Sequence, residues 1–401
     1  MLCGEVDGMS PNSTRINLQK CKRGFLVKVP HYVFIVFMFA LFMLPAGCNA
    51  KPKEKPLSLG YFTDIYSPSI SSDGNQILFT GCGHTEFPAC TIYRFERDSN
   101  KLHRYLPRSS AETLGGGRYS PTSTRFVFKI IPLDSNKELI FDDSQIAIVN
   151  QDGNGLRVIT QSKGVKLSPT LSYDEKSVVF YRGPISDKGS PLRKQKTRVI
   201  GSDLYKVDVR TGEETQLTRL EFYGVSDLYI TPDGKDVVFA GDSPMRLPHT
   251  ENNDAVKQFE DNYKKKYHGN TIIHYPLDGS EINKAPVPLF TFDYGSDIPT
   301  VAKDGTIWFK GRVSEEHYIH FYQRYPDSTL KELSYGALGE GKQDKALIVL
   351  HNMVVTPDGS QIVTLNANQN TGQRFIGVLD TKSNVHSNLT VPASAENITI
   401  R

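Results

Sequence analysis

Long helical patterns are missing from this sequence of 401 residues. No extended stretch repeats apolar residues at the three- and four-residue spacing of an amphipathic helix. The one long apolar run, residues 31–44, is shorter than the roughly 20 residues that a membrane-spanning helix needs. Aromatic residues make up 10% of the chain, which also holds 32 glycines and 23 prolines, a composition typical of a turn-rich, all-β protein.

Short motifs of familiar enzymes are also missing. The chain has no G-x-S-x-G elbow and no H-E-x-x-H zinc motif. His317 and His320 are three residues apart in an expected strand, so they face opposite sides of a sheet and are poorly placed to share a metal ion. These absences predict no metal and no cofactor, and they favour a protein without catalytic activity.

Excess charge is confined to the start of the chain. Residues 1–47 hold five lysines and arginines and two acidic residues, and the remainder has 42 of each sign. A formally neutral remainder offers no basic surface of the kind that binds nucleic acid. We therefore expect no nucleic-acid partner.

A short turn followed by a buried strand recurs along the chain. In residues 229–242, "YITPDGKDVVFAGD", Asp233 and Gly234 form the turn, and valines and phenylalanine follow it. Similar turns lie at Asp73, Asp174, Asp304 and Asp358, and a degenerate copy lies near residue 122. Their separations of roughly 50 to 70 residues are close to the period of four-stranded propeller blades.

A second hairpin follows each of these six turns, for example "SDLYKVDVRTGEETQLT" at residues 202–218. Two hairpins supply four strands, and six such units predict an all-β, six-bladed propeller of four-stranded antiparallel blades. Two blades carry insertions. Residues 186–203 are basic, and residues 250–270 place Val256, Phe259, Tyr263 and Tyr267 at helical spacing, which predicts a short helix that packs on the propeller or docks a partner.

The sequences "TPDGKDVVFAGD" and "SDLYKVDVRTGEETQLT" resemble the WD-like repeats of the C-terminal propeller of the TolB family. The resemblance covers roughly residues 57–401. It implies the propeller fold and a partner in the bacterial cell envelope. It is specific for architecture and does not name a ligand.

The N-terminal residues resemble a lipoprotein signal peptide. A basic region and the apolar run lead to "PAGC", which ends at Cys48, although Pro45 departs from the usual lipobox. We predict a signal peptide at residues 1–47, lipid attachment at Cys48, a polar tether at 48–56 and a propeller at 57–401. The expected location is the periplasmic side of the envelope, with the lipid anchor in the outer membrane. Ordinary cleavage, an uncleaved anchor and a start at Met9 remain alternatives.

Cys82 and Cys90 are the two cysteines left after the signal region and Cys48. An even pair in an oxidising compartment predicts a disulfide. A metal site is the weaker alternative, because only His84 lies nearby.

Polar residues six and seven positions before the turns predict a ligand site at the mouth of the central channel. If the repeats align, these residues are Tyr66, Ser226, Asp227, Asp297, His351 and Asn352. The favoured function is a lipid-anchored binding or scaffold module for an envelope protein, peptide or glycan. The alternatives are a propeller enzyme, a lyase or hydrolase acting at the same mouth, and a propeller that has lost its ligand.

Overall fold

The structure is a computed structural model. It describes residues 62–83, 90–186, 198–199, 201–222, 225–241, 271–280, 282, 287–290, 296–312, 319–333, 347–368, 374–383, 385–389, 391–392 and 395–401. In these residues the chain forms six larger sheets and one two-stranded sheet, and each of the six larger sheets contains four antiparallel strands in sequence order, as the repeats predict. The only helical element in the described segments is a 3-10 turn, η2 (Phe141–Asp143). No helix in this part of the chain is long and apolar enough to cross a membrane.

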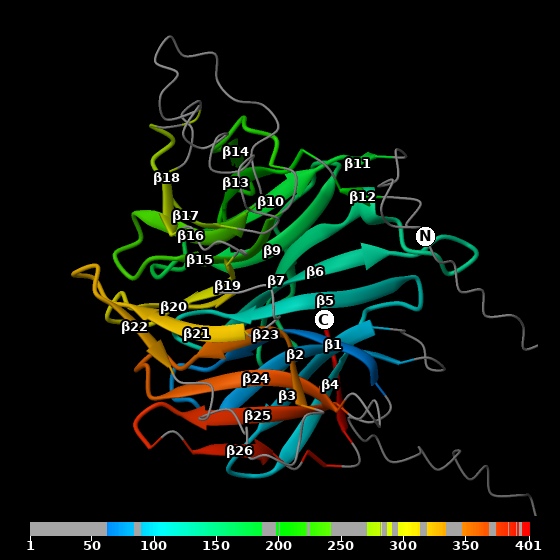
Figure 1. The fold of residues 1–401 in the computed structure, drawn as a ribbon. Coiled ribbons are helices and arrows are strands. Elements are labelled where there is room, and N and C mark those ends of the chain that lie inside the picture. The colour runs from blue at the N-terminus through cyan, green and yellow to red at the C-terminus, as the bar shows by residue number, and fades with distance from the viewer. Residues whose placement is uncertain are drawn as a thin grey trace, which may run out of the picture. The chain divides into compact units, whose positions relative to one another are not determined.

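Blades 1 to 3 come from the first half of the chain (Figure 1). Blade 1 contains β1 (Phe62–Ile70), β2 (Gln76–Gly83), β3 (Cys90–Glu96) and β4 (Lys101–Leu106). Blade 2 contains β5 (Glu112–Tyr119), β6 (Arg125–Pro132), β7 (Gln145–Asn150) and β8 (Arg157–Val158). Blade 3 contains β9 (Val165–Leu171), β10 (Ser177–Gly183), β13 (Asp203–Asp208) and β14 (Glu214–Gln216), and a small hairpin pairs β11 (Ile185–Ser186) with β12 (Arg198–Val199).

Blades 4 to 6 repeat the same order. Blade 4 contains β15 (Val225–Ile230), β16 (Asp236–Gly241), β17 (Thr271–Pro276) and β18 (Val287–Phe290). Blade 5 contains β19 (Ser296–Val301), β20 (Ile307–Arg312), β21 (Ile319–Arg324) and β22 (Leu330–Leu333). Blade 6 contains β23 (Leu347–Val355), β24 (Gln361–Asn368), β25 (Arg374–Asp380) and β26 (His386–Leu389). The helix predicted within residues 250–270 and most of the basic insertion lie outside the described residues.

The turns of blades 1, 3, 4 and 6 share one set of side-chain hydrogen bonds, and the blade 5 turn has Ala302 in place of the hydroxyl residue. In blade 3 the Ser172 hydroxyl donates to Asp174 Oδ1 at 2.7 Å and accepts from the Ser177 amide at 3.0 Å. Thr231 and Asp233 make the same contacts in blade 4. The hydroxyl that donates to Asp174 lowers the pKa of this carboxyl. In the degenerate blade 2 turn the Thr122 hydroxyl stands in for the carboxylate, 3.2 Å from Ser120 Oγ. The local chemistry of the turn therefore starts each blade.

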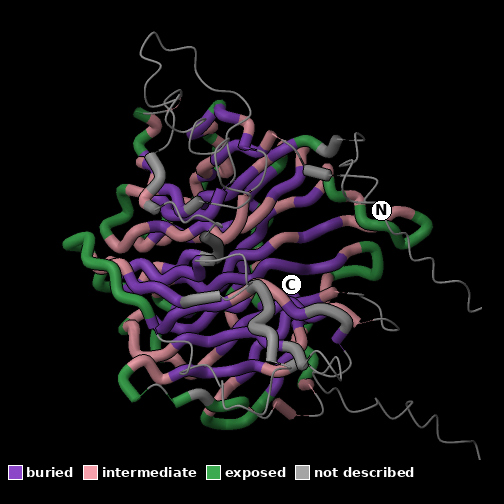
Figure 2. Tube along the Cα trace, viewed as in Figure 1, coloured by how far each residue is buried: buried purple, intermediate pink, exposed green. Residues whose placement is uncertain are grey.

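Apolar cores lie between the blades, and together they close the ring. The strands are mostly buried and the connecting turns are exposed (Figure 2). Each of six hydrophobic clusters joins two neighbouring blades. The cluster that joins the last blade to the first packs Val363, Leu365 and Ile376 against Phe62, Phe79 and Tyr93. The ring is therefore closed by packing between blade 1 and blade 6, without a strand of one completing the sheet of the other.

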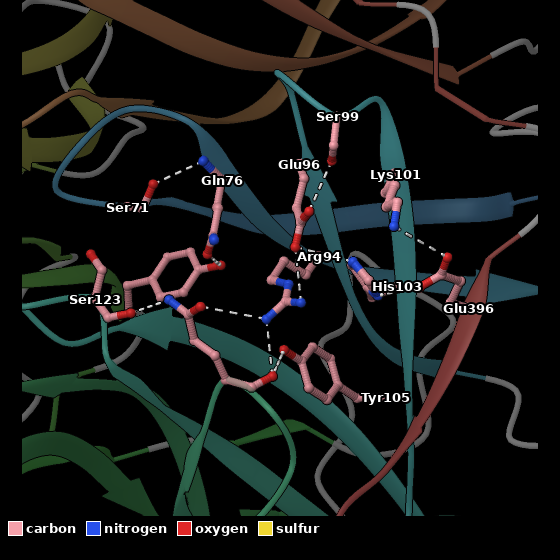
Figure 3. Close-up of polar contacts among 12 residues, drawn as sticks. Ser71, Gln76, Arg94, Glu96, Ser99, Lys101, His103, Tyr105, Ser123 and Glu396 are labelled. Atoms are coloured by element: carbon pink, nitrogen blue, oxygen red, sulfur yellow. Dashed lines mark hydrogen bonds and ion pairs between the residues drawn. The ribbon is translucent and has the colours of Figure 1, made fainter.

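The last strand, β27 (Glu396–Thr399), pairs in parallel with β4 and becomes a fifth strand of blade 1 (Figure 1). Residues beyond it reach blade 2, where the Arg401 amide donates to the Gly153 carbonyl at 2.8 Å. Figure 3 shows the charged and titratable side chains that lie beside this strand. His103 lies 3.1 Å from Glu96 and 3.5 Å from Glu396, and Lys101 lies 3.8 Å from Glu396. The sequence repeats do not predict this clasp between the chain end and blades 1 and 2.

Replacing Gly153 with alanine tests the clasp. Gly153 has φ +84°, and an added Cβ would lie 2.7 Å from Ile398 Cγ2 and 2.8 Å from the Thr399 carbonyl oxygen. Gly279→Ala is the matched control, because Gly279 has φ +75° and no atom within 4 Å of the added Cβ. Both changes carry the left-handed strain of about 1–2 kcal/mol. We expect Gly153→Ala to reduce the free energy of unfolding by about 1 kcal/mol more, through overpacking.

The measurement is urea denaturation of both variants followed by fluorescence. Equal urea midpoints for Gly153→Ala and Gly279→Ala would show that β27 moves away from the added methyl group without loss of stability. They would also show that β27 does not hold blades 1 and 2 together.

Candidate functional site

A β-bulge interrupts the innermost strand of every blade. The pairing of the first strand with the second shifts between Tyr66 and Ser69 in blade 1 and at the matching positions of the other five blades. Ser67, Gly116, Ser168 and Asp227 lie in these bulges with positive φ angles. A bulge bends the strand and redirects its side chains. Here it redirects the side chains of the six strands that surround the propeller axis.

The residues predicted to form the channel mouth lie at or beside these bulges. Tyr66 is on β1, Ser226 and Asp227 are on β15, Asp297 is on β19, and His351 and Asn352 are on β23. The Tyr66 hydroxyl lies 3.3 Å from the position of a Cβ at Gly115, so it reaches the innermost strand of blade 2. The side chains of Asp297 and His351 are outside the described part of the structure. None of the four whose side chains are described, Tyr66, Ser226, Asp227 and Asn352, lines the axial cavity described next, although Asp227 contacts one residue that does.

A cavity of about 320 Å³ lies on the axis, at the end of the innermost strands next to the repeated turns. Two consecutive residues from each innermost strand line it: Ser69–Ile70, Arg118–Tyr119, Thr170–Leu171, Tyr229–Ile230, Thr300–Val301 and Val354–Val355. Turn residues form the rim, among them Ser72, Tyr173 and Lys303. Among the described residues, the cavity lining contains two cationic side chains, no carboxylate, three tyrosines and several hydroxyl groups.

Hydroxyl groups in the cavity satisfy backbone groups of the neighbouring blade. Ser69 Oγ accepts from the Tyr119 amide at 3.0 Å, and Thr300 Oγ1 accepts from the Val355 amide at 3.4 Å. Thr170 Oγ1 donates to the Leu228 carbonyl at 2.6 Å. An innermost strand has an open edge, and its unpaired polar groups are costly to bury. These hydroxyls therefore join the blades as well as lining the cavity.

Arg118 is the central charge of the cavity, with only 7% of its surface exposed. Its guanidinium donates to the Leu228 carbonyl and, at 3.1 Å, to Thr170 Oγ1. It also lies 3.5 Å from Asp227 Oδ1 and 4.4 Å from the ring centre of Tyr229. Burial raises the pKa of Tyr229, and the nearby arginine opposes that shift. One side chain thus connects blades 2, 3 and 4 across the axis.

A second groove, of about 630 Å³, lies between blades 3 and 4 and shares Tyr173 with the axial cavity. Its lining includes the carboxylates of Asp174, Asp233, Asp236 and Asp278. Burial raises the pKa of Asp236, although His274, 3.2 Å away, acts in the opposite direction. Within the described residues, no three His, Cys, Asp or Glu side chains are placed to hold a metal ion.

The predicted disulfide is present. Cys82 and Cys90 are directly opposite each other in the β2–β3 pair, with their Cα atoms 4.0 Å apart, and their sulfur atoms are bonded. The bond closes the base of the hairpin whose connecting residues 84–89 lie outside the described structure. Cys48 is also outside it.

Comparisons with known proteins support the fold. No family model matches the chain, and no curated protein matches it in sequence. TolB from Acinetobacter baumannii is similar in structure, with a TM-score of 0.52 and 15% identity over 85% of this chain. The match spans 66% of that TolB chain. An oligogalacturonate lyase from Vibrio parahaemolyticus has a TM-score of 0.51 and 16% identity, covering 85% of this chain and 80% of the lyase.

An oligogalacturonate lyase in complex with manganese gives a TM-score of 0.52 at 16% identity, over 83% of this chain and 77% of the lyase. The chain is therefore a six-bladed β-propeller with distant structural similarity to TolB and to oligogalacturonate lyase. At such low identity the similarity establishes the fold alone, and these relatives have different functions.

Replacing Arg118 with methionine tests its role as a connection between blades. The change leaves the Asp227 carboxylate and the Leu228 carbonyl without this donor, so we expect a loss of about 2–4 kcal/mol in the free energy of unfolding. Arg125→Met is the control, because it breaks a more exposed pair, Arg125–Glu175 at 2.6 Å, and should cost about 1 kcal/mol or less. Urea midpoints measure both. A smaller effect at Arg118 than at Arg125 would contradict a structural role for the axial charge.

Proposed function

We propose that this chain is a lipid-anchored binding propeller of the bacterial cell envelope, which receives a segment of an envelope protein, peptide or glycan in its axial cavity. The observation that carries the proposal is the cavity lining. All six innermost strands contribute to it, and hydroxyl groups, tyrosines and two cations converge there. Ligand sites are concave and combine apolar walls with a few polar groups that set orientation.

The charge of the lining supports an acidic or polar ligand group rather than a basic one. Lys303 is an exposed lining residue at the rim, and no carboxylate is part of the lining. Tyrosines offer both a flat apolar face and a hydroxyl group, which suits peptide and sugar ligands. The alternative, a propeller enzyme of the lyase or hydrolase type, places its reaction at the same end of the axis.

Photo-crosslinking tests whether a partner binds at the axial cavity. A photoreactive amino acid placed at Ser72, on the cavity rim, should give one predominant adduct in cells that express the protein. The control position is Lys382, an exposed residue in the outer turn of blade 6. We expect the adduct from Ser72 and not from Lys382, and its loss when Thr170→Trp fills the cavity. An adduct that survives Thr170→Trp would place the partner elsewhere, and release of shortened glycans by purified protein would favour the enzyme.

Metabolic labelling tests the anchor. Cells supplied with an alkyne fatty acid should incorporate it into the wild-type protein and not into Cys48→Ala, because the thiol of Cys48 is the proposed attachment point. The labelled protein should fractionate with membranes, and Cys82→Ala should keep its label as the control. Equal labelling of the wild type and Cys48→Ala, or no label in either, would overturn the lipoprotein assignment.

A further inference from the structure

Lys129 and Lys310 occupy matching positions on the second strands of blades 2 and 5, but Lys310 lies opposite Asp297, whereas Lys129 lies opposite a glycine. It lies on β6, the second strand of blade 2, opposite Gly115 of the innermost strand β5. A Cβ added to Gly116 would lie 3.2 Å from Lys129 Cε and touch no other atom within 4 Å. The glycine run at residues 115–117 thus leaves the innermost strand without side chains where the lysine passes over it.

No counterion accompanies this amine among the described residues, and no hydrogen bond of its Nζ is found there. The elements that pack against β6 carry these charged groups: Glu112 and Arg118 on β5, Lys166 on β9, and Asp142 and Asp143 in η2. None of them shifts the pKa of Lys129, which burial alone lowers to about 8. The residue nevertheless keeps partial solvent exposure.

Lys166 provides a comparison within the same molecule. Its pKa is also lowered to about 8, first by burial. Its ammonium donates to the carbonyls of Ser144 at 2.8 Å, Ser162 at 2.5 Å and Gly164 at 3.2 Å, and the residue has no exposed surface. All three protons of Lys166 are therefore used inside the protein. Burial lowers the pKa of Lys129 to a similar value, but no hydrogen bond from its ammonium to a described residue is found.

We propose that Lys129 is a reactive amine site that takes an aldehyde or ketone entering along the propeller axis. The neutral amine would attack the carbonyl carbon, so that a C–N bond forms and the carbonyl oxygen becomes a hydroxyl. Loss of water then gives the imine, and water reverses the reaction. Lysines act in this way when desolvation leaves part of the amine unprotonated near neutral pH. This site is independent of the proposed partner-binding function.

The test traps the imine in the folded, wild-type protein. The protein is incubated with glyoxylate and sodium cyanoborohydride, which reduces the imine to a stable secondary amine, and each lysine is quantified by peptide mass spectrometry. A pKa near 8 instead of about 10.4 gives an amine roughly a hundredfold more neutral form at pH 7. Allowing for lower intrinsic nucleophilicity, we expect Lys129 to be modified at least about tenfold faster than Lys176, whose side chain is 80% exposed.

Two controls separate the access of the reagent to the amine from the effect of burial on its pKa. Lys166 should stay unmodified, because its ammonium is enclosed by three carbonyls. Gly116→Ala should slow the labelling of Lys129 at least about fivefold, whereas Gly234→Ala, with φ +72° and open space around the added Cβ, should leave it unchanged. Near-ultraviolet circular dichroism checks that both variants remain folded.

The rate at Lys129 should rise between about pH 7 and 9 and then level off, since the neutral form accumulates as pH passes the lowered pKa. Labelling of Lys129 no faster than that of Lys176, or labelling of Lys166 at the same rate as Lys129, would overturn the proposal.

Discussion

The packing of each blade against the next is the constraint on which the rest of this molecule depends. A four-stranded sheet cannot bury both of its faces alone, and here each face is buried against a neighbour through one of six apolar clusters. The cluster between blade 6 and blade 1 closes the ring without a strand shared between them. The parallel pairing of β27 with β4 adds a link between the chain end and blades 1 and 2. The ring in turn keeps the six innermost strands at the spacing that creates an axial cavity.

The innermost strands meet a second constraint, because their inner edges have no further strand to pair with. Side chains supply the missing hydrogen bonds to these backbone groups. The hydroxyls of Ser69, Thr170 and Thr300 bond to backbone groups of the next blade. Arg118 donates to the Leu228 carbonyl. The residue after each of these faces the other way and packs in an apolar core, as Ile70 and Leu171 do. Alternation along the strand therefore gives the first residue of each pair a polar contact at the axis, whereas the second packs in the core and adds an apolar part to the cavity wall. The polar character of the cavity follows from this division.

Much of the fold could be predicted from the sequence because the turn is a local interaction. A hydroxyl, a carboxylate and a left-handed residue within five positions are visible in the chain at four of the blade starts, whereas Thr122 replaces the carboxylate in blade 2 and Ala302 replaces the hydroxyl residue in blade 5. The left-handed residue is Gly74 or Gly234 in regular copies and Ser123 or Glu175 in degenerate ones. β27 could not be predicted in this way, because four residues that pair in parallel with a strand almost 300 positions earlier carry no local signal.

The candidate site could be predicted only in outline. Counting back six and seven positions from the turns reaches the bulges of the innermost strands, whereas the axial cavity is lined by residues three and four positions before the turn. The bulges shift the register there, and three of them, at Ser67, Ser168 and Asp227, have a residue other than glycine in the left-handed conformation. Arg118 and Tyr229 were missed for this reason, although Asp227, which was predicted, contacts Arg118.

The fold of this propeller is easier to recognise from the sequence than its function, because different positions of each blade determine the two. Positions that repeat from blade to blade, such as the turn and the buried second strand, are those that every blade needs for packing. The position four residues before the turn carries serine, arginine, threonine, tyrosine, threonine and valine in the six blades. Packing of the ring does not require one residue type there, so the axis is free to carry a particular set of contacts. The contacts that are particular to this propeller are therefore encoded in the positions where its repeats differ, and similarity to other propellers at about 15% identity carries no information about them.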